Sequence, residues 1–401
     1  MKYDFESVID RRGKDALAVD DIPYEKGSVK EGFSEIPMWV ADMNFATAPS
    51  VTNALAERIK HPLYGYFEES DEYYNSIINW QKERNGVCGL KKENIGYENG
   101  VLGGVVAALR VFCQQGDKVL VHSPTYIGFT KSLENNGFKI IHSPLKKDES
   151  GKWIMDYDDM REKLQKENIH AAILCSPHNP CGRVWEKEEL EKAMEIYKEN
   201  DVFVISDEIW SDIILNGHKH IPTQSVSEDA KMRTVALYAP SKTFNLAGLV
   251  GSYHIVYNSY IHDRMKKESS LSHYNSCNVM SMHALIGAYS AEGAEWTDEL
   301  RQVLSENVNY AYDFIATHFK GVELFKPEGT YMLFIDCEKF CKENGVSLDE
   351  VLKKGVGAGV IWQDGRPFHG EYSIRMNLAL PKALLKEALD RLNKFAFSCN
   401  G

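Results

Sequence analysis

Strand-like and helix-like segments alternate through the middle of this sequence, and that alternation limits the fold more than any other feature. A short apolar run at 171–174 is followed by 186–200, where Leu190 and Met194 recur at helical spacing. The next segment, 202–206, is a continuous apolar run of the kind that is buried on both faces of a sheet. Further segments of these two kinds are a helix at 101–113 and strands at 118–122, 139–142 and 234–238. The order predicts an α/β domain with a mostly parallel sheet flanked by helices.

The last quarter of the chain has a different pattern. It holds a long charged helix at 296–318, strand-like runs at 331–335 and 372–377, and a closing helix from 381. The first residues show little periodicity. We therefore expect three parts: an N-terminal arm, 1–45, that packs with the small domain, a large domain, 46–289, and a smaller α+β C-terminal domain, 290–401.

Charge and composition exclude several classes of protein. The 401 residues carry 46 basic and 58 acidic side chains, so the net charge is −12. That balance argues against a protein that binds nucleic acid or an anionic membrane through its charge. No apolar stretch is long enough to cross a bilayer, and the acidic start lacks the pattern of a signal peptide. We expect a cytoplasmic globular protein with no nucleic-acid or membrane partner.

Two patterns that resemble ligand-binding motifs are rejected on their context. The eight cysteines follow no disulfide or zinc spacing, and the best metal candidate, CSPHNPC at 175–181, is stiffened by prolines and has no fourth ligand nearby. We therefore expect no metal. The run GVGAG at 355–359 resembles a nucleotide fingerprint but does not join a strand to a helix.

Two charged residues follow predicted strands directly, and ligands of such sheets lie at the carboxyl ends of the strands. Lys242 follows strand 234–238 among small and apolar residues. A desolvated lysine amine can form a Schiff base and act as a base, although an isolated lysine is ordinarily a solvated surface charge. Asp207 follows strand 202–206, where a buried carboxylate favours a cationic partner over the alternative role of a helix cap.

Several motifs, in matching order along the chain, make the sequence similar to a known superfamily. SDEI at 206–209, SPHNPCG at 176–182, SKTFNLAGL at 241–249 and YSIRMN at 372–377 resemble the fold-type I, pyridoxal phosphate (PLP)-dependent aminotransferase superfamily of class I/II. PMWVADM at 37–43, HPLYGY at 61–66 and the lysine motif resemble its MalY/PatB-like cystathionine β-lyase branch. The similarity extends from about residue 36 to the last helix.

The resemblance assigns roles around the cofactor ring. Lys242 would hold PLP as a Schiff base and, once the substrate amine displaces it, remove the Cα proton. Asp207 would keep the pyridine nitrogen protonated, so that the ring can accept electrons. Asn179 would donate a hydrogen bond to the phenolic oxygen. Tyr126 would stack on the ring; without the family pattern it is an ordinary core aromatic.

The resemblance also implies which residues bind the cofactor phosphate and the substrate. The backbone of Gly100, Val101 and Leu102 at a helix start would bind the phosphate, with the Ser241 hydroxyl and Tyr66, or Tyr64, from the neighbouring subunit of a homodimer with shared active sites. Arg375 would bind the substrate α-carboxylate with its planar fork, the alternative being an internal ion pair. The remaining predicted substrate contacts are Val40 and Ala41.

Four positions depart from the family pattern. Trp210, which we expect to contact the cofactor, stands where many aminotransferases have tyrosine and the lyase branch often has histidine. Val250 stands where many aminotransferases have an arginine that binds the phosphate. The absence of this arginine resembles the lyase branch. Ala239 replaces a phosphate-binding serine, so that Ser241 is the substitute, and Asn44 stands where the branch often has aspartate.

The resemblance implies an enzyme that acts on a small amino-acid substrate. The leading hypothesis is a PLP-dependent carbon–sulfur β-lyase of the cystathionine β-lyase or cysteine desulfhydrase type, which yields pyruvate, ammonia and a thiol. An aminotransferase of class I/II shares the early steps and is the alternative. A regulatory binding protein built on the same fold is the alternative from a different class.

Overall fold

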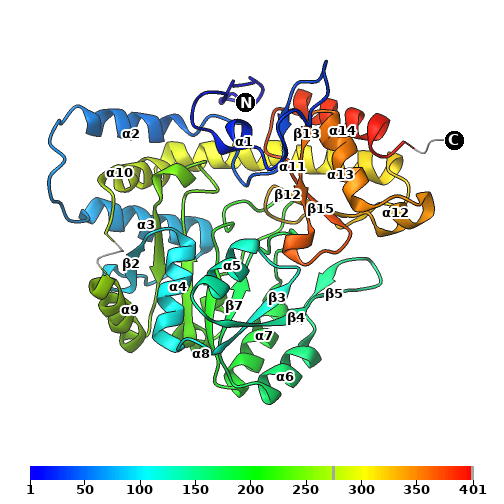
Figure 1. Cartoon of the computed structure of the whole chain (residues 1–401). Coiled ribbons are helices and arrows are strands. Elements are labelled where there is room, and N and C mark those ends of the chain that lie inside the picture. Colours follow the sequence, from blue (N-terminus) through cyan, green and yellow to red (C-terminus); the bar gives the residue numbers. More distant parts are fainter. Residues whose placement is uncertain (273–275, 399–401) are drawn as a thin grey trace.

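A seven-stranded sheet forms the centre of the larger part of the protein (Figure 1). The structure, a computed structural model, describes residues 1–272 and 276–398. Strands β3, β4, β7, β8 and β9 pair in parallel, whereas β10 runs antiparallel to both of its neighbours, β2 and β9. In spatial order the strands are β2 (Ile95–Glu98), β10 (Ser252–Ile255), β9 (Thr234–Tyr238), β8 (Phe203–Asp207), β7 (Ile169–Cys175), β3 (Lys118–Ser123) and β4 (Lys139–Pro144).

Helices cover both faces of this sheet because its strands are apolar on both sides. In β7, Ala171 and Ile173 join the core beneath one set of helices, and Ala172 and Leu174 join the core beneath the other. The first set is α4 (Val101–Phe112), α5 (Ile127–Asn135) and α9 (Ser259–Ser272), and the second is α6 (Tyr157–Lys166), α7 (Lys187–Glu199) and α8 (Glu228–Arg233). The predicted α/β class with a mostly parallel sheet is confirmed.

A second, antiparallel sheet lies in the C-terminal part, coloured yellow to red in Figure 1. Its strands are β11 (Glu323–Leu324), β12 (Met332–Asp336), β15 (Ser373–Asn377) and β14 (Gln363–Asp364), in that order. The helices of this part are α11 (Ala291–His318), α12 (Glu338–Asn344), α13 (Leu348–Gly357) and α14 (Lys382–Phe395). The long helix α11 begins five residues before the predicted start at 296, because Ser290 caps it by accepting a hydrogen bond from the Gly293 amide at 3.1 Å.

The first residues pack against this C-terminal part. The arm contains α1 (Leu17–Asp20) and the two-residue β1 (Ile36–Pro37), which pairs in parallel with β13 (Val360–Ile361). The Trp39 indole donates a hydrogen bond to the Ala18 carbonyl at 3.1 Å. Together these contacts carry the chain from the arm towards the space between the two sheets.

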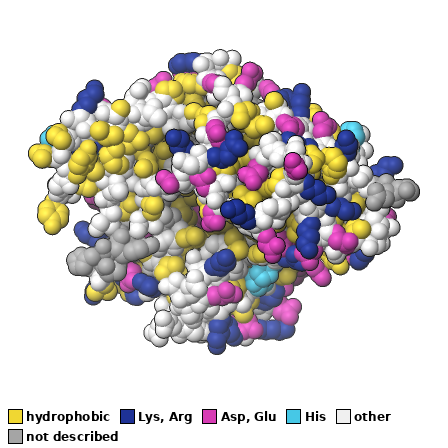
Figure 2. Space-filling model, turned by 45° about the horizontal axis from the view of Figure 1, so that its top comes forward, with side chains coloured by type: hydrophobic (Ala, Val, Ile, Leu, Met, Phe, Trp, Pro, Cys, Tyr) yellow, Lys and Arg dark blue, Asp and Glu magenta, His cyan; other side chains and the backbone are white. Residues whose placement is uncertain are grey.

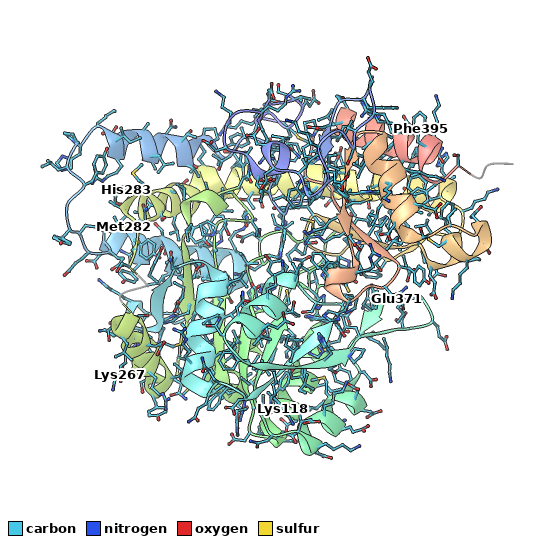
Figure 3. All side chains as sticks on the ribbon, viewed as in Figure 1. Lys118, Lys267, Met282, His283, Glu371 and Phe395 are labelled. Atoms are coloured by element: carbon cyan, nitrogen blue, oxygen red, sulfur yellow. The ribbon has the colours of Figure 1, made fainter. Side chains whose placement is uncertain are left out.

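Helices α2 (Pro49–Ile59), α3 (Asp71–Asn85) and α10 (Val279–Ala288) form the end of the molecule opposite the C-terminal part. Figure 3 labels Met282 and His283 on α10, which packs directly against α2. A β-carbon on Gly287 would lie 2.6 Å from the Ser50 carbonyl oxygen, so the two helices approach this closely only with glycine there. A small hairpin, β5 (Lys146–Lys147) and β6 (Trp153–Ile154), completes the fold.

Several local predictions match these elements. The strand 234–238 is β9, and the helix 186–200 is α7 with its two capping residues. The helix predicted at 101–113 ends at Phe112, and the GVGAG run begins inside α13, where it joins no strand to a helix. Among the described residues, no helix combines the length and the apolarity that a membrane crossing requires.

Candidate active site

One pocket collects most of the predicted site residues at the carboxyl ends of β7, β8 and β9 and at the start of α4. Its volume is about 200 Å³. The predicted residues that line it are Ala41, Gly100, Val101, Leu102, Tyr126, Asn179, Asp207, Trp210, Ser241 and Lys242. They come from segments up to 201 positions apart in the chain, Ala41 and Lys242 being the extremes. The pocket thus lies at the strand ends, where the order of elements predicts ligand-binding residues.

Lys242 lies in the turn after β9 with its amine in the pocket. Its Nζ donates a hydrogen bond to the Ala41 carbonyl at 2.8 Å and lies 5.7 Å from the centre of the Trp210 ring. Burial lowers the pKa of the Lys242 amine to about 8, and the positive charge of Arg375 acts in the same direction. A measurable fraction of this amine is consequently neutral near pH 7 and can act as a nucleophile or a base.

Asp207 ends β8 with its carboxyl group buried in the pocket wall. Burial raises the pKa of Asp207 to about 7, against the opposing effects of the Ile209 amide, which donates to Oδ1 at 3.1 Å, and of Lys242. Among the described residues, Asp207 forms no ion pair. A buried acid in this state gains most from a cationic ligand group placed against it.

Arg375 lies on β15, in the C-terminal part, and is also buried. It donates to Asn179 Oδ1 at 3.2 Å, to the Trp39 carbonyl at 3.1 Å and to Gln363 Oε1, while its Nε has no partner among the residues that the structure describes. Within the described residues Arg375 makes no ion pair, so the alternative of an internal ion pair finds no partner there. Burial lowers the pKa of the guanidinium to about 10, which leaves it charged. A buried arginine with an unused N–H is suited to an anionic ligand.

Asn179 connects Arg375 to the pocket. Its side chain is almost fully buried, and the oxygen accepts from Arg375. The Nδ2 amide is therefore the end that remains for a ligand, and it has no hydrogen-bond partner among the described residues. That arrangement fits a neutral donor aimed at an oxygen of the bound group.

The start of α4 forms the opposite end of the pocket. Gly100 has a φ of 79° and caps a helix whose first residues, Val101 and Leu102, line the pocket. The unpaired N–H groups of a helix start, together with the Ser241 hydroxyl, suit a phosphate. Val250 lines the same region, and Lys242 is the only cation in the lining among the described residues.

Tyr126 and Trp210 supply the aromatic walls. A β-carbon on Gly128 would lie only 2.3 Å from Tyr126 Cε1, so the Tyr126 ring occupies the space above a residue without a side chain. Phe129 holds the same ring edge-on, with centroids 5.4 Å apart. Trp210 is buried and packs edge-on against Tyr331 at 4.7 Å.

Four predicted residues do not line this pocket. Arg375 stands behind Asn179, and Val40 contributes its carbonyl to Asn377 at 2.6 Å rather than a side chain to the lining. Tyr64 and Tyr66 are exposed on the connection between α2 and α3. Their predicted role in a neighbouring subunit stays a prediction.

Several lining residues were not predicted from the sequence: Cys175, Ile209, Ala247 and Gly251. Cys175 was considered only as part of the rejected metal candidate at 175–181, although its place at the end of β7 could have marked it as a lining residue. Tyr331 was missed as well; its hydroxyl donates to the Ala41 carbonyl at 3.1 Å. The described residues contain no group of three or more side chains arranged to hold a metal ion.

Comparison with known proteins identifies the family. The model of the aminotransferase class I and II family matches residues 38–392. Cystathionine β-lyase PatB of Bacillus subtilis is 34% identical over 387 residues, which are 94% of this chain and 97% of PatB. Protein MalY of Escherichia coli is 30% identical, with 96% of this chain and 97% of MalY covered.

A solved structure agrees with these relatives. The PLP-bound C–S lyase from Staphylococcus hominis superposes with a TM-score of 0.89 at 33% identity and covers 99% of both chains. The chain therefore belongs to the aminotransferase class I and II family, as its motifs predicted.

Proposed function

We propose that this protein is a PLP-dependent carbon–sulfur β-lyase that converts cystathionine, cysteine or a related S-substituted cysteine to pyruvate, ammonia and a thiol. The observation that carries the proposal is the trio of Lys242, Asp207 and Arg375. All three are at least partly buried around one pocket, and none forms an ion pair among the described residues. Buried charges are ordinarily paired, so these three residues call for ligand groups that complement them. An aldehyde would suit Lys242, a cationic ring nitrogen would suit Asp207, and a carboxylate would suit Arg375. The full-length similarity to a cystathionine β-lyase and a C–S lyase selects the reaction.

The cofactor, pyridoxal 5′-phosphate, fits the donor set of the pocket. Asp207 would pair with its ring nitrogen, the Asn179 amide with its phenolic oxygen, and the Tyr126 ring with its face. The start of α4 and Ser241 would hold the phosphate. When bound, this group supplies the electron sink that makes a Cα proton acidic and allows a leaving group to depart from Cβ.

The protein's own residues then bind the substrate and move its proton. Arg375, fixed by Asn179 and the Trp39 carbonyl, would bind the α-carboxylate. The neutral Lys242 amine would take the Cα proton, and the Ala41 carbonyl is the acceptor on which the resulting ammonium can rest. The Cβ–S electron pair leaves with sulfur as the thiolate. One water molecule hydrolyses the remaining 2-aminoacrylate to pyruvate and ammonia, so no oxidant or reductant is required.

We also propose a homodimer with shared active sites and a division of labour along the chain. Leu63, Tyr64, Tyr66 and Phe67 are exposed between α2 and α3. Hydrophobic side chains gather at this end of the molecule, at the left of Figure 2. A second copy covering this surface would bring Tyr66, or Tyr64, to the phosphate of its partner. Within one chain, 46–289 would hold the cofactor, 290–401 would supply Arg375, and 1–45 would supply the segment that carries Val40 and Ala41.

The test uses the purified protein loaded with pyridoxal phosphate and given L-cystathionine without any keto acid. We expect a visible absorbance band from the bound cofactor and continuous release of pyruvate. A Lys242→Ala protein, prepared in parallel, should lose both. Cofactor binding without pyruvate release would contradict the lyase proposal.

An aminotransferase is the second candidate, because the matching family model is named for that activity. It would consume an added keto acid and form a new amino acid, and it would not accumulate pyruvate from L-cystathionine alone. Product analysis with and without keto acid separates the two reactions. A regulatory binding role would instead survive in the Lys242→Ala protein.

A further inference from the structure

Residues 39–43, which we call the strap, pass beside the pocket with every backbone carbonyl held by a side chain from a distant segment. The donors come from β15, from the residue just before β12, from the turn after β9 and from the start of the arm. They are Arg375 to Trp39, Asn377 to Val40 and Asp42, Lys242 and Tyr331 to Ala41, and Asn245 and Arg11 to Met43. Connecting segments ordinarily run over the surface, where water can satisfy their backbone carbonyls. In the strap, protein side chains supply these hydrogen bonds instead, so the position of the strap is fixed by the rest of the fold.

The Ala41 carbonyl accepts from two side-chain donors, one of which is the amine of Lys242. The Lys242 amine lies at 2.8 Å and the Tyr331 hydroxyl at 3.1 Å from the same oxygen. Tyr331 is fully buried, and its ring packs against Trp210, so its hydroxyl is held in place independently of the lysine. Lys242, in contrast, must give up this contact whenever its nitrogen is engaged in chemistry.

We propose that Tyr331 is a positioning residue that keeps the strap in place while the Lys242 amine is bound to the cofactor. In the cofactor-free protein the two donors share one acceptor, and either one is sufficient. After loading, Tyr331 is the donor that remains. This matters for the reaction because Ala41 lines the pocket and the neighbouring Trp39 carbonyl orients Arg375.

The inference rests on the proposed function only in assuming that pyridoxal phosphate takes the Lys242 amine. Two amides of the strap region report its opening. Met43 N–H donates to Asn245 Oδ1 at 2.9 Å, and Asn44 N–H donates to the Ala379 carbonyl at 2.9 Å. Hydrogen exchange of the peptide that contains them measures how often the strap opens, without any reference to turnover.

The first experiment compares four cofactor-free proteins: wild type, Tyr331→Phe, Lys242→Ala and the double variant. Each single variant keeps one donor and should exchange at close to the wild-type rate. The double variant loses both and should exchange roughly 2- to 12-fold faster, the effect of one lost hydrogen bond. Additive effects of the two single changes would overturn the shared-acceptor argument.

The second experiment repeats the measurement after loading with pyridoxal phosphate. The wild type should stay protected, whereas Tyr331→Phe should now exchange faster by the same roughly 2- to 12-fold. Tyr197→Phe is the matched control, because it also removes a buried hydroxyl, one that contacts His122 at 3.1 Å far along the chain from the strap. Equal exchange of Tyr331→Phe in both states would refute the proposal. Failure of the absorbance band to form in wild type would instead refute the cofactor assignment and leave the four cofactor-free results standing.

Discussion

Replacement of Gly128 by alanine tests whether cofactor binding depends on the position of the Tyr126 ring. The new β-carbon would lie 2.3 Å from Tyr126 Cε1, 2.8 Å from Cζ and 3.0 Å from Leu102 Cδ1. Ordinary carbon contacts begin near 3.5 Å, so the ring must retreat by about 1.2 Å. Gly128 is the second residue of α5 and its φ is not in the left-handed region, so the alanine meets a steric obstacle and no backbone strain.

The net effect follows from two opposing terms. Alanine gains about 1 kcal/mol of helix propensity over glycine, whereas overpacking of this size costs about 1–3 kcal/mol. We expect the cofactor-free Gly128→Ala protein to be as stable as wild type or less stable by up to about 2 kcal/mol. The displaced ring should weaken binding of pyridoxal phosphate by roughly 2- to 12-fold, the worth of one aromatic stacking contact. Turnover should fall further, by up to about 100-fold, because stacking fixes the reacting geometry.

The assays are thermal unfolding of the cofactor-free protein, titration with pyridoxal phosphate followed by visible absorbance, and pyruvate release. Gly248→Ala is the matched control: nothing lies within 4 Å of its added β-carbon, its φ is not positive, and it also lies close to the pocket, next to Ala247. The control should keep wild-type cofactor affinity. If Gly128→Ala matched the control in affinity and turnover, the argument that the pocket depends on the seat of the Tyr126 ring would be wrong.

Three further predictions concern the charged trio. Arg375→Lys keeps a charge but loses the planar fork, so KM for cystathionine should rise roughly 10- to 100-fold while the cofactor absorbance stays unchanged. Asp207 has a pKa raised to about 7 in the folded protein, so the fold binds its proton more tightly than the unfolded chain does. The free energy of unfolding of the cofactor-free protein should therefore fall as pH rises from about 4 to about 7. In Asp207→Asn this fall should be smaller by up to about 4 kcal/mol, as measured by denaturant titration at each pH. The Lys242 amine has a pKa of about 8, so its rate of reaction with pyridoxal phosphate should rise about tenfold for each unit of pH increase up to pH 8 and stay constant above pH 8. A rate that does not change between pH 7 and 9 in stopped-flow absorbance would contradict the lowered pKa.

The sequence could predict the residues whose chemistry is written in their type and position. Asp207 is the last residue of the apolar strand β8, and Lys242 lies in the turn after the apolar strand β9. Because the carboxyl ends of parallel strands meet at one edge of a sheet, the approach of these two residues followed from the order of elements. Gly100 was predicted from a different local signal, the start of a helix, where free N–H groups suit a phosphate. For each of these, one local pattern contained both the element and the functional group.

The anchoring of the strap and the position of the Tyr126 ring beside Gly128 could not be predicted in this way, and the reason is physical. The acceptors in the strap are backbone carbonyls, which every residue type carries, so nothing in the side chains of residues 39–43 marks them as anchored. The donors are 201 to 336 positions away for Lys242, Tyr331 and Arg375, and their pairing depends on how the C-terminal sheet is placed against the large one. Gly128 matters only because it has no side chain, which leaves room for the Tyr126 ring, and the sequence does not show which group fills that room. Two levels of structure therefore specify a site of this kind. Local sequence specifies the groups that we propose to be catalytic, and the packing of the two sheets specifies the surface that holds these groups in position. A substitution that leaves every catalytic side chain intact, such as Tyr331→Phe, should for that reason disturb the loaded protein more than the cofactor-free one.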